Sequence, residues 1–471
     1  MTRSSSRCHG PIDRRNFLKI GGLSLGALSS GLSPDLAGLL AAEAAGEALD
    51  KDFSVILFWA NGGPSHLETF DMKPKAPSEY RGEFQPISTN VPGLDICELL
   101  PNLAGMAEKF SIVRSLFHNR NEHSGGTCRF LSGYTPKAAN PADAEYPELG
   151  SVVAKQLEDQ VQDIPLFVAN TKFYGGGPAY LGAAYRAFMP NSKMITSSGA
   201  NRYDPVPLFG AKDGQLSARD TALASLRKRN SLLSEFDVFR RELDRTGSMD
   251  ALDKFRRRAL AMLTSSRTAR AFDLTKEPES VQQRYGKTHW GRSLLLSRRL
   301  VEHGVRFVQM QATFRLKKEN GRTSNWDDHS VNADIFKAYR ERMPVFDQAV
   351  PALINDLYDR GLNEKVLFIF CGEFGRTPKI RHQDKATKRP GRDHWARSMS
   401  IFLSGGGLNM GQVVGATNSR GEDPVRRVMN SNCLLSTVYK RFGINTDHHF
   451  YDNTGRPVPI LTDGEPIREL F

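Results

Sequence analysis

The run of six residues from Ser54 to Trp59 limits the fold of this chain more than any other feature. It reads Ser-Val-Ile-Leu-Phe-Trp and is followed by Asn61-Gly62-Gly63-Pro64-Ser65. A strand with one wet face alternates polar and apolar residues, whereas a continuous apolar run indicates a strand buried on both faces. Glycine and proline then mark a turn. The sequence therefore predicts an α/β fold with a mainly parallel sheet flanked by helices.

The rest of the chain repeats this alternation of strands and helices. We expect strands over 111–116, 164–169, 305–311, 366–370 and 398–404, and helices over 101–109, 125–131, 149–157, 289–302 and 332–360. Such alternation is typical of a doubly wound sheet. From about 201 to 284 the sequence turns arginine-rich and amphipathic, with few strand signals. We expect a helical insertion there, whose charges are those of solvated helix faces.

The N-terminal sequence predicts the cellular location of the protein. Arg14 and Arg15 precede a weakly apolar stretch rich in glycine and serine, and small residues follow near Ala45. This pattern indicates a twin-arginine signal peptide over 1–45 and a single domain over 46–471. A membrane anchor is the alternative, but Pro34 and Asp35 interrupt the roughly 20 apolar residues that a spanning helix needs. We expect a periplasmic or secreted protein.

The charge of the chain favours anionic partners. The formal net charge is +12, and residues 1–45 hold five basic and three acidic side chains, so the mature chain keeps +10. A basic surface favours an anionic small molecule, a glycan ester or peripheral contact with the cell envelope. Nucleic acid is not expected, because the charge is spread out and no recognition motif accompanies it.

The cysteines do not suggest a cross-linked scaffold. Cys97, Cys128, Cys371 and Cys433 are widely spaced, which fits neither a zinc cluster nor a disulfide framework. We expect them to be mostly buried thiols.

Acidic and histidine side chains gather at the ends of the expected strands, where α/β proteins usually bind ligands. Five separated segments would bring them to one edge of the sheet. Carboxylate oxygens and imidazole nitrogens suit a divalent metal, zinc first and manganese or iron as alternatives. The expected metal ligands are His66, Asp71, His123, Asp327, His329, Glu373 and His394.

Several of these residues have a structural alternative. Asp327 and the two residues after it could cap the helix expected at 332. His394 could be a structural histidine that Asp393 orients, or a ligand with Asp393 behind it. Glu373 stands in Gly-Glu-Phe-Gly, where flanking glycines suit a tight turn that exposes a carboxylate.

The segment from His123 to Gly133 adds a second kind of signal. Two glycines enter the expected helix, and the N–H groups of a helix N-terminus attract phosphate or sulfate. A glycine-loosened helix cap is the alternative. Ser124 and Thr127 are the candidate nucleophiles or anion contacts, and Arg376 would stabilise a charged transition state.

Five motifs occur together and in order: residues 61–71, 123–133, 326–329, 372–378 and 393–395. Together they resemble an uncharacterised family of twin-arginine-exported bacterial proteins that is grouped by fold with alkaline phosphatases and sulfatases. The resemblance implies a mainly parallel sheet between helices, two divalent metals and a nucleophile at a helix N-terminus. It places His123 at the nucleophile position and Glu373 at the aspartate of the sulfatase Ser-Asp-His-Gly motif.

The chain also departs from that pattern. Phe374 stands where the sulfatase motif has its histidine, and Ala60-Asn61-Gly62 replaces paired aspartates after the first strand. The modified cysteine of sulfatases is absent at position 123. Two functions therefore stay open: an exported metal-dependent hydrolase of phosphate or sulfate esters, or a non-catalytic protein that binds an anionic glycan or an envelope partner. Acids and imidazoles clustered at strand ends favour the hydrolase.

Overall fold

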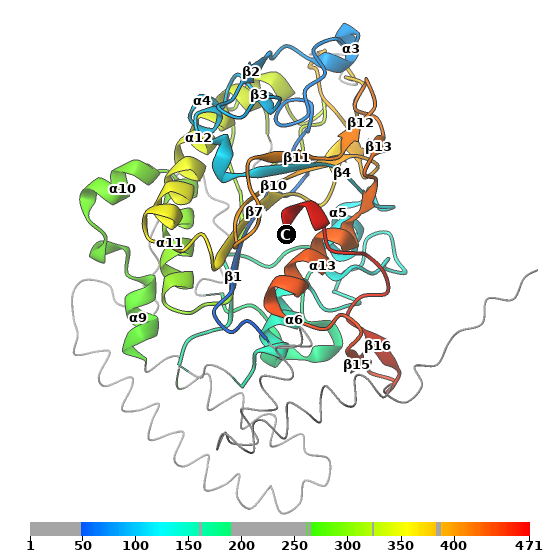
Figure 1. Ribbon diagram of the computed structural model, residues 1–471. Helices are drawn as coiled ribbons and strands as arrows, with labels where there is room; N and C mark the ends of the chain where they lie inside the picture. Colours follow the sequence, from blue (N-terminus) through cyan, green and yellow to red (C-terminus); the bar gives the residue numbers. More distant parts are fainter. Residues whose placement is uncertain (1–48, 160–162, 190–260, 262–264, 323–324, 383–387) are drawn as a thin grey trace, which may run out of the picture.

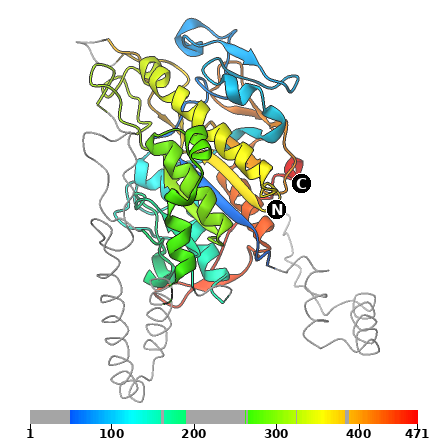
Figure 2. The same cartoon turned by 90° about the vertical axis from the view of Figure 1, so that its left-hand side faces the viewer.

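The computed structural model describes residues 49–159, 163–189, 261, 265–322, 325–382 and 388–471. The predicted signal peptide and most of the predicted insertion lie outside the described residues. An eight-stranded sheet runs through the molecule, and helices cover both of its faces (Figures 1 and 2). The predicted α/β architecture is confirmed.

The sheet is mixed but mainly parallel. Strands β5 (Phe167–Ala169), β6 (Phe307–Gln311), β1 (Ser54–Trp59) and β7 (Val366–Cys371) lie side by side in one direction. Strand β10 (Met399–Gly405) runs antiparallel between β7 and β4 (Ser111–Phe117). Strands β11 (Gln412–Val414) and β14 (Met429–Asn430) pair with β4 in parallel, so all but β10 share one direction.

Strand β1 lies in the interior of the sheet, between β6 and β7. Ile56 and Phe58 point into one core, shared with α11 (His289–Glu302) and α12 (Ile335–Asp359). Leu57 and Trp59 point into the other core, shared with α5 (His123–Ser132), α6 (Leu149–Gln156) and α13 (Ser431–Phe442). Because both faces are covered, every residue of β1 is buried, as its continuous apolar run predicts.

Shorter elements surround this frame. The expected helix over 101–109 is divided by Gly105 into α4 (Pro101–Ala104) and a 3-10 turn (Ala107–Lys109). Two short helices lie at the end of the predicted insertion, α9 (Ser266–Phe272) and α10 (Glu279–Tyr285). The other short elements are α3 (Ser78–Arg81), β2 (Pro86–Ser88), β3 (Asp95–Cys97), β8 (Gly375–Arg376), β9 (His394–Trp395), β12 (Ala416–Thr417), β13 (Pro424–Arg426), β15 (His449–Tyr451) and β16 (Pro457–Pro459).

The thiols behave as the sequence predicts. Cys97, Cys128 and Cys371 are buried, Cys433 is half-buried, and all four are free. In the described ranges, no helix has the length and apolarity needed to cross a membrane.

The turn after β1 joins three segments at the carboxyl edge of the sheet. Gly62 has a φ of +101°, and a Cβ atom there would lie 2.5 Å from the backbone nitrogen of Asp327. The N–H of Gly62 donates to Oε1 of Glu373 at 2.7 Å. Only glycine permits both the positive φ and this close approach. The glycine turn therefore brings the loops after β6 and β7 against β1.

The first prediction compares Gly62→Ala with Gly93→Ala. Both glycines have positive φ, but a Cβ at position 93 would meet no atom within 4 Å. The unfavourable backbone conformation costs each variant about 1–2 kcal/mol. Gly62→Ala also forces the Asp327 loop away, so its unfolding midpoint should fall clearly below that of Gly93→Ala in thermal denaturation. Equal midpoints would show that the close approach does not stabilise the fold.

Candidate metal centre

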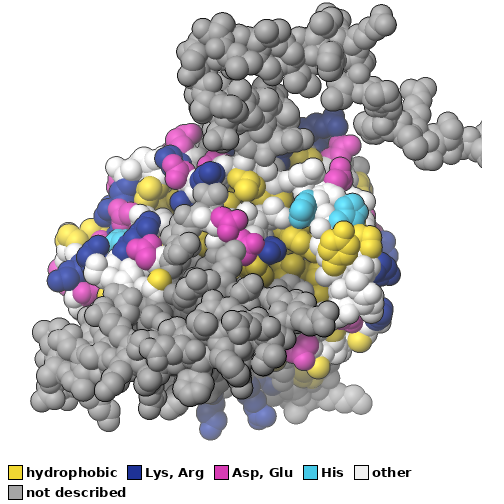
Figure 3. Space-filling view, turned by 90° about the horizontal axis from the view of Figure 1, so that it is seen from below, with side chains coloured by type: hydrophobic (Ala, Val, Ile, Leu, Met, Phe, Trp, Pro, Cys, Tyr) yellow, Lys and Arg dark blue, Asp and Glu magenta, His cyan; other side chains and the backbone are white. Residues whose placement is uncertain are grey.

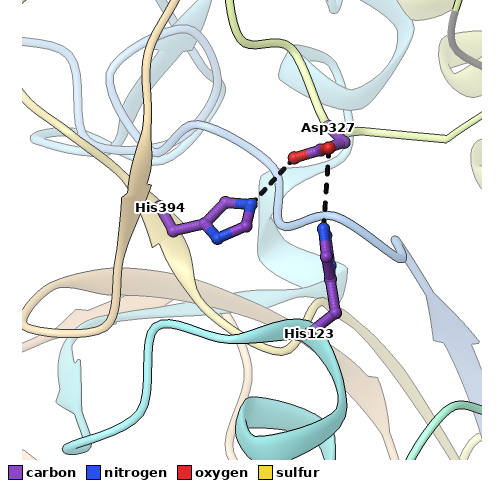
Figure 4. A group of neighbouring side chains, drawn as sticks. All are labelled: His123, Asp327 and His394. Atoms are coloured by element: carbon purple, nitrogen blue, oxygen red, sulfur yellow. Dashed lines mark hydrogen bonds and ion pairs between the residues drawn. The ribbon is translucent and has the colours of Figure 1, made fainter. Parts of the chain in front are cut away.

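Three side chains from three segments converge at the carboxyl edge of the sheet (Figure 4). His123 is the first residue of α5, Asp327 lies in the loop after β6, and His394 begins β9. Nε2 of His394 lies 2.8 Å from Oδ1 of Asp327, and Nε2 of His123 lies 3.5 Å from Oδ2. One nitrogen or oxygen from each side chain lies within 4.8 Å of the others. Two imidazoles and a carboxylate could hold a zinc ion.

His329 extends this cluster. Its Nε2 lies 3.0 Å from Oδ1 of Asp327 and 3.0 Å from Nε2 of His394. The single carboxylate of Asp327 thus faces three imidazoles.

The far nitrogen of each imidazole is held by an acceptor. Nδ1 of His123 lies 2.8 Å from Oε1 of Glu373, and Nδ1 of His329 lies 2.8 Å from Oδ1 of Asp393. Nδ1 of His394 lies 2.6 Å from the backbone oxygen of Asn121. Because ionised carboxylates and backbone carbonyls only accept, each Nδ1 donates, and in a neutral ring Nε2 then carries a lone pair. Metal-binding histidines are held in the same way.

The Nε2 lone pairs of the three imidazoles face the negatively charged carboxylate of Asp327. Because electron-rich atoms repel one another, protons or a metal ion must lie between them. Burial lowers the pKa of His123, but hydrogen bonds with Asp327 and Glu373 outweigh this effect and raise it to about 9. Burial also lowers the pKa of His394, and there the shift remains downward. Burial raises the pKa of Asp327, yet its hydrogen bonds to the three histidines hold it well below the usual range. A metal ion would replace a proton in this arrangement.

Arg376 holds Asp327 in place. Its buried guanidinium lies 2.7 Å from Oδ1 of Asp327. The other donors bind the backbone oxygens of four residues: Gly62, Gly63, Trp326 and Arg392. The prediction that Arg376 stabilises a transition state therefore needs correction. With its donors bound to the backbone and to Asp327, it is a positioning residue.

Glu373 and Phe374 fix the histidines from the other side. Oε1 of the buried Glu373 accepts from Gly62 and His123, while Oε2 has no hydrogen-bond partner among the described residues. The ring of Phe374 packs against the imidazole of His394, with centroids 4.2 Å apart. Phe374 stands where the resemblance expects a metal-binding histidine. Its ring instead packs against another histidine, His394, and orients it.

Two predicted ligands lie in a different polar network. Nε2 of the buried His66 lies 2.8 Å from the backbone oxygen of Gly421. Asp71 accepts from Lys73 and Thr417. In the described part of the chain, neither belongs to the group of side chains that could hold a metal. The turn after β1 leads His66 and Asp71 away from the cluster, so their prediction as ligands is corrected.

The predicted hydroxyl groups lie on the first turns of α5. Ser124 follows His123 and is half-buried. Thr127 lies one turn after His123 on the same side of the helix, and its buried hydroxyl has no partner among the described residues.

The capping alternative for residues 327–329 is wrong. Asp334 caps α12, because its side chain accepts from the N–H of Lys337. Asp328 forms a buried ion pair with Arg342 at 2.8 Å. Asp327 therefore does not cap α12, and its carboxylate contacts the three histidines.

Sequence reasoning missed two supporting contacts. It assigned Asp393 to His394, whereas the structure pairs Asp393 with His329. It also missed Asn121, which holds His394 through its backbone carbonyl. A backbone contact has no residue-type signal, so the sequence could not have revealed it.

A family model described as "Protein of unknown function (DUF1501)" matches residues 52–471. The chain belongs to this family. No curated protein matches the chain.

Several solved structures are similar to this family member. The PsFucS1 sulfatase from Pseudoalteromonas sp. shares 11% identity, with 90% of this chain and 72% of that chain covered and a TM-score of 0.39. The C-terminal periplasmic domain of EcEptC from Escherichia coli, in complex with Zn, shares 9% identity over 84% of each chain, with a TM-score of 0.36. TAB5 alkaline phosphatase, a mutant with Mg bound, shares 9% identity over 84% of this chain and 99% of that chain, with a TM-score of 0.34.

The second prediction tests the role of Arg376. Arg376→Met removes one partner of Asp327 and leaves several buried carbonyl oxygens unpaired, which should cost about 1–3 kcal/mol of folding free energy for each unpaired group. The control, Arg381→Met, removes an arginine that is 60% exposed and lies 3.3 Å from Asp393. Exposed ion pairs contribute less than about 1 kcal/mol. Thermal unfolding should separate the two variants, and similar midpoints would contradict the positioning role.

Proposed function

We propose that this protein is an exported, metal-dependent hydrolase of phosphate or sulfate esters. The observation that carries the proposal is the convergence of three imidazole Nε2 atoms on the carboxylate of Asp327. His123, Asp327 and His394 would hold the metal, zinc first with manganese or iron as alternatives, and His329 would be a further ligand. Glu373, a ligand in the sequence-based prediction, would instead orient His123 from behind. When bound, a divalent cation polarises an ester oxygen and stabilises the negative charge that develops there.

The start of α5 supports an anionic substrate. The first N–H groups of a helix lack partners within the helix, and the N-cap residue Glu122 provides no side-chain cap. A helix N-terminus with free N–H groups attracts phosphate and sulfate. Because His123 is the first residue of this helix, the anion would lie beside the metal ligands.

Ser124 is the favoured nucleophile in this proposal. It lies next to His123 and is partly exposed, so an ester can reach its hydroxyl. Thr127 is only 1% exposed and is the weaker candidate. A serine at such a site would attack phosphorus or sulfur, and the alcohol of the ester would leave.

The sequence supports the proposed location and substrate class. The twin-arginine segment supports export to the periplasm or beyond, and the formal charge of +10 after residue 45 supports an anionic ester, such as a glycan ester, as substrate.

The third prediction concerns bound metal. The mature chain, residues 46–471, should hold about one or two equivalents of a divalent metal by elemental analysis. Asp327→Asn and His329→Ala should lose it, because each removes a proposed ligand. Glu373→Ala and Asp393→Asn should bind the metal roughly 10–100-fold more weakly, since Glu373 orients His123 and Asp393 orients His329. His449→Ala, which changes an exposed histidine, is the control. If the protein holds no metal under metal-replete conditions, the hydrolase hypothesis is excluded. The remaining hypothesis is then a non-catalytic protein that binds an anionic glycan or an envelope partner.

The fourth prediction concerns turnover. With p-nitrophenyl phosphate and p-nitrophenyl sulfate as probes, Ser124→Ala should lower kcat by more than about 10³-fold while the metal content stays unchanged. Thr127→Val keeps the side-chain shape and should lower kcat less than about tenfold. Full activity in Ser124→Ala would exclude Ser124 as the nucleophile.

A further inference from the structure

A cavity of about 650 Å³ lies apart from the metal cluster. Its walls come from the loop before α6, the segment after β5 and the β15–β16 hairpin, and no member of the metal cluster lines it. Helix α6 and the hairpin lie at the bottom of the molecule (Figure 1). Seen from below, the part of this face that Figure 3 does not draw in grey carries acidic, basic and hydrophobic side chains interspersed. The cavity has the volume of a small-molecule site.

Two buried polar side chains line the cavity. Gln309 is 2% exposed and Glu148 is 6% exposed. Nε2 of Gln309 donates to Oε2 of Glu148 at 3.4 Å, so Gln309 holds the Glu148 carboxylate in place at the wall. A carboxylate accepts hydrogen bonds, and the cavity therefore favours a ligand that donates them.

The charges around the cavity are balanced. Its lining includes four basic and four acidic residues: Lys137, Lys172, Arg186, Arg456, Asp143, Glu145, Glu148 and Asp452. Two pairs are direct, Lys172 with Asp143 at 3.1 Å and Arg456 with Asp452 at 3.4 Å. An uncharged ligand suits this lining better than a cation or an anion.

Aromatic rings complete the wall. Tyr146 and Tyr180 line the cavity, with ring centroids 6.5 Å apart and planes at 84°. Tyr134 stacks on Tyr146 at 4.3 Å and holds its orientation. Tyrosine rings offer an apolar face and a polar edge to one ligand.

We propose that this cavity binds an uncharged saccharide of about two sugar rings. Such a ligand combines hydroxyl donors for Glu148, which Gln309 positions, with C–H faces that pack on Tyr180. This binding site is separate from the metal centre, and the proposal does not depend on hydrolase activity.

The test is calorimetric titration of the mature full chain with four disaccharides: cellobiose, maltose, lactose and N,N′-diacetylchitobiose. At least one should bind the wild type. Gln309→Leu and Tyr180→Ala should each weaken that binding tenfold or more, and the near-isosteric Glu148→Gln should weaken it several-fold. Tyr174→Ala is the matched control, because Tyr174 is 59% exposed and does not line the cavity. Asp327→Asn should bind the same sugar as tightly as the wild type.

Three outcomes would overturn the proposal. The first is that none of the four disaccharides binds the wild type up to about 10 mM. The second is unchanged binding in Gln309→Leu and Tyr180→Ala when both retain the wild-type unfolding midpoint. The third is binding only of sulfated disaccharides, lost in Asp327→Asn, which would place the sugar at the metal centre instead.

Discussion

The carboxyl edge of the sheet depends on one ion pair, between the buried guanidinium of Arg376 and the half-buried carboxylate of Asp327. Burying a charge costs several kcal/mol unless its remaining donors or acceptors are satisfied. Here the guanidinium also binds carbonyl oxygens from the turn after β1, the loop after β6 and the segment before β10. The same contacts that offset desolvation therefore fix three loops and aim the Asp327 carboxylate at the histidines.

Local signals in the sequence revealed much of this arrangement. The apolar run of β1 predicted a central buried strand, and the glycines after it predicted the turn, because both depend on neighbouring residues. Since parallel strands end at one edge, the positions of His123 and Asp327 after their strands were enough to expect these two residues together. The family match agrees with the resemblance that the five motifs indicated.

Other features depend on contacts between distant parts of the chain. Periodicity shows that β10 is buried, but it does not show that β10 runs antiparallel to its neighbours. Because β10 is antiparallel, its start lies at the carboxyl edge of the other strands, and His394, which precedes β10, lies there too. The bond from His123 to Glu373 spans 250 positions, and the assignment of Asp393 to His329 spans 64. His66 was misplaced because its sequence position relative to β1 does not determine the path of the following turn. The cavity around Gln309 combines four separated segments and has no local pattern.

The acceptors behind the three imidazoles are not equivalent. His123 and His329 donate to carboxylates, whereas His394 donates to the neutral backbone carbonyl of Asn121. A carboxylate partner increases the basicity of an imidazole more than a carbonyl does. In the proposed metal centre His394 would thus be the weakest electron donor of the three, and exchange of ligands would begin on the side of β9.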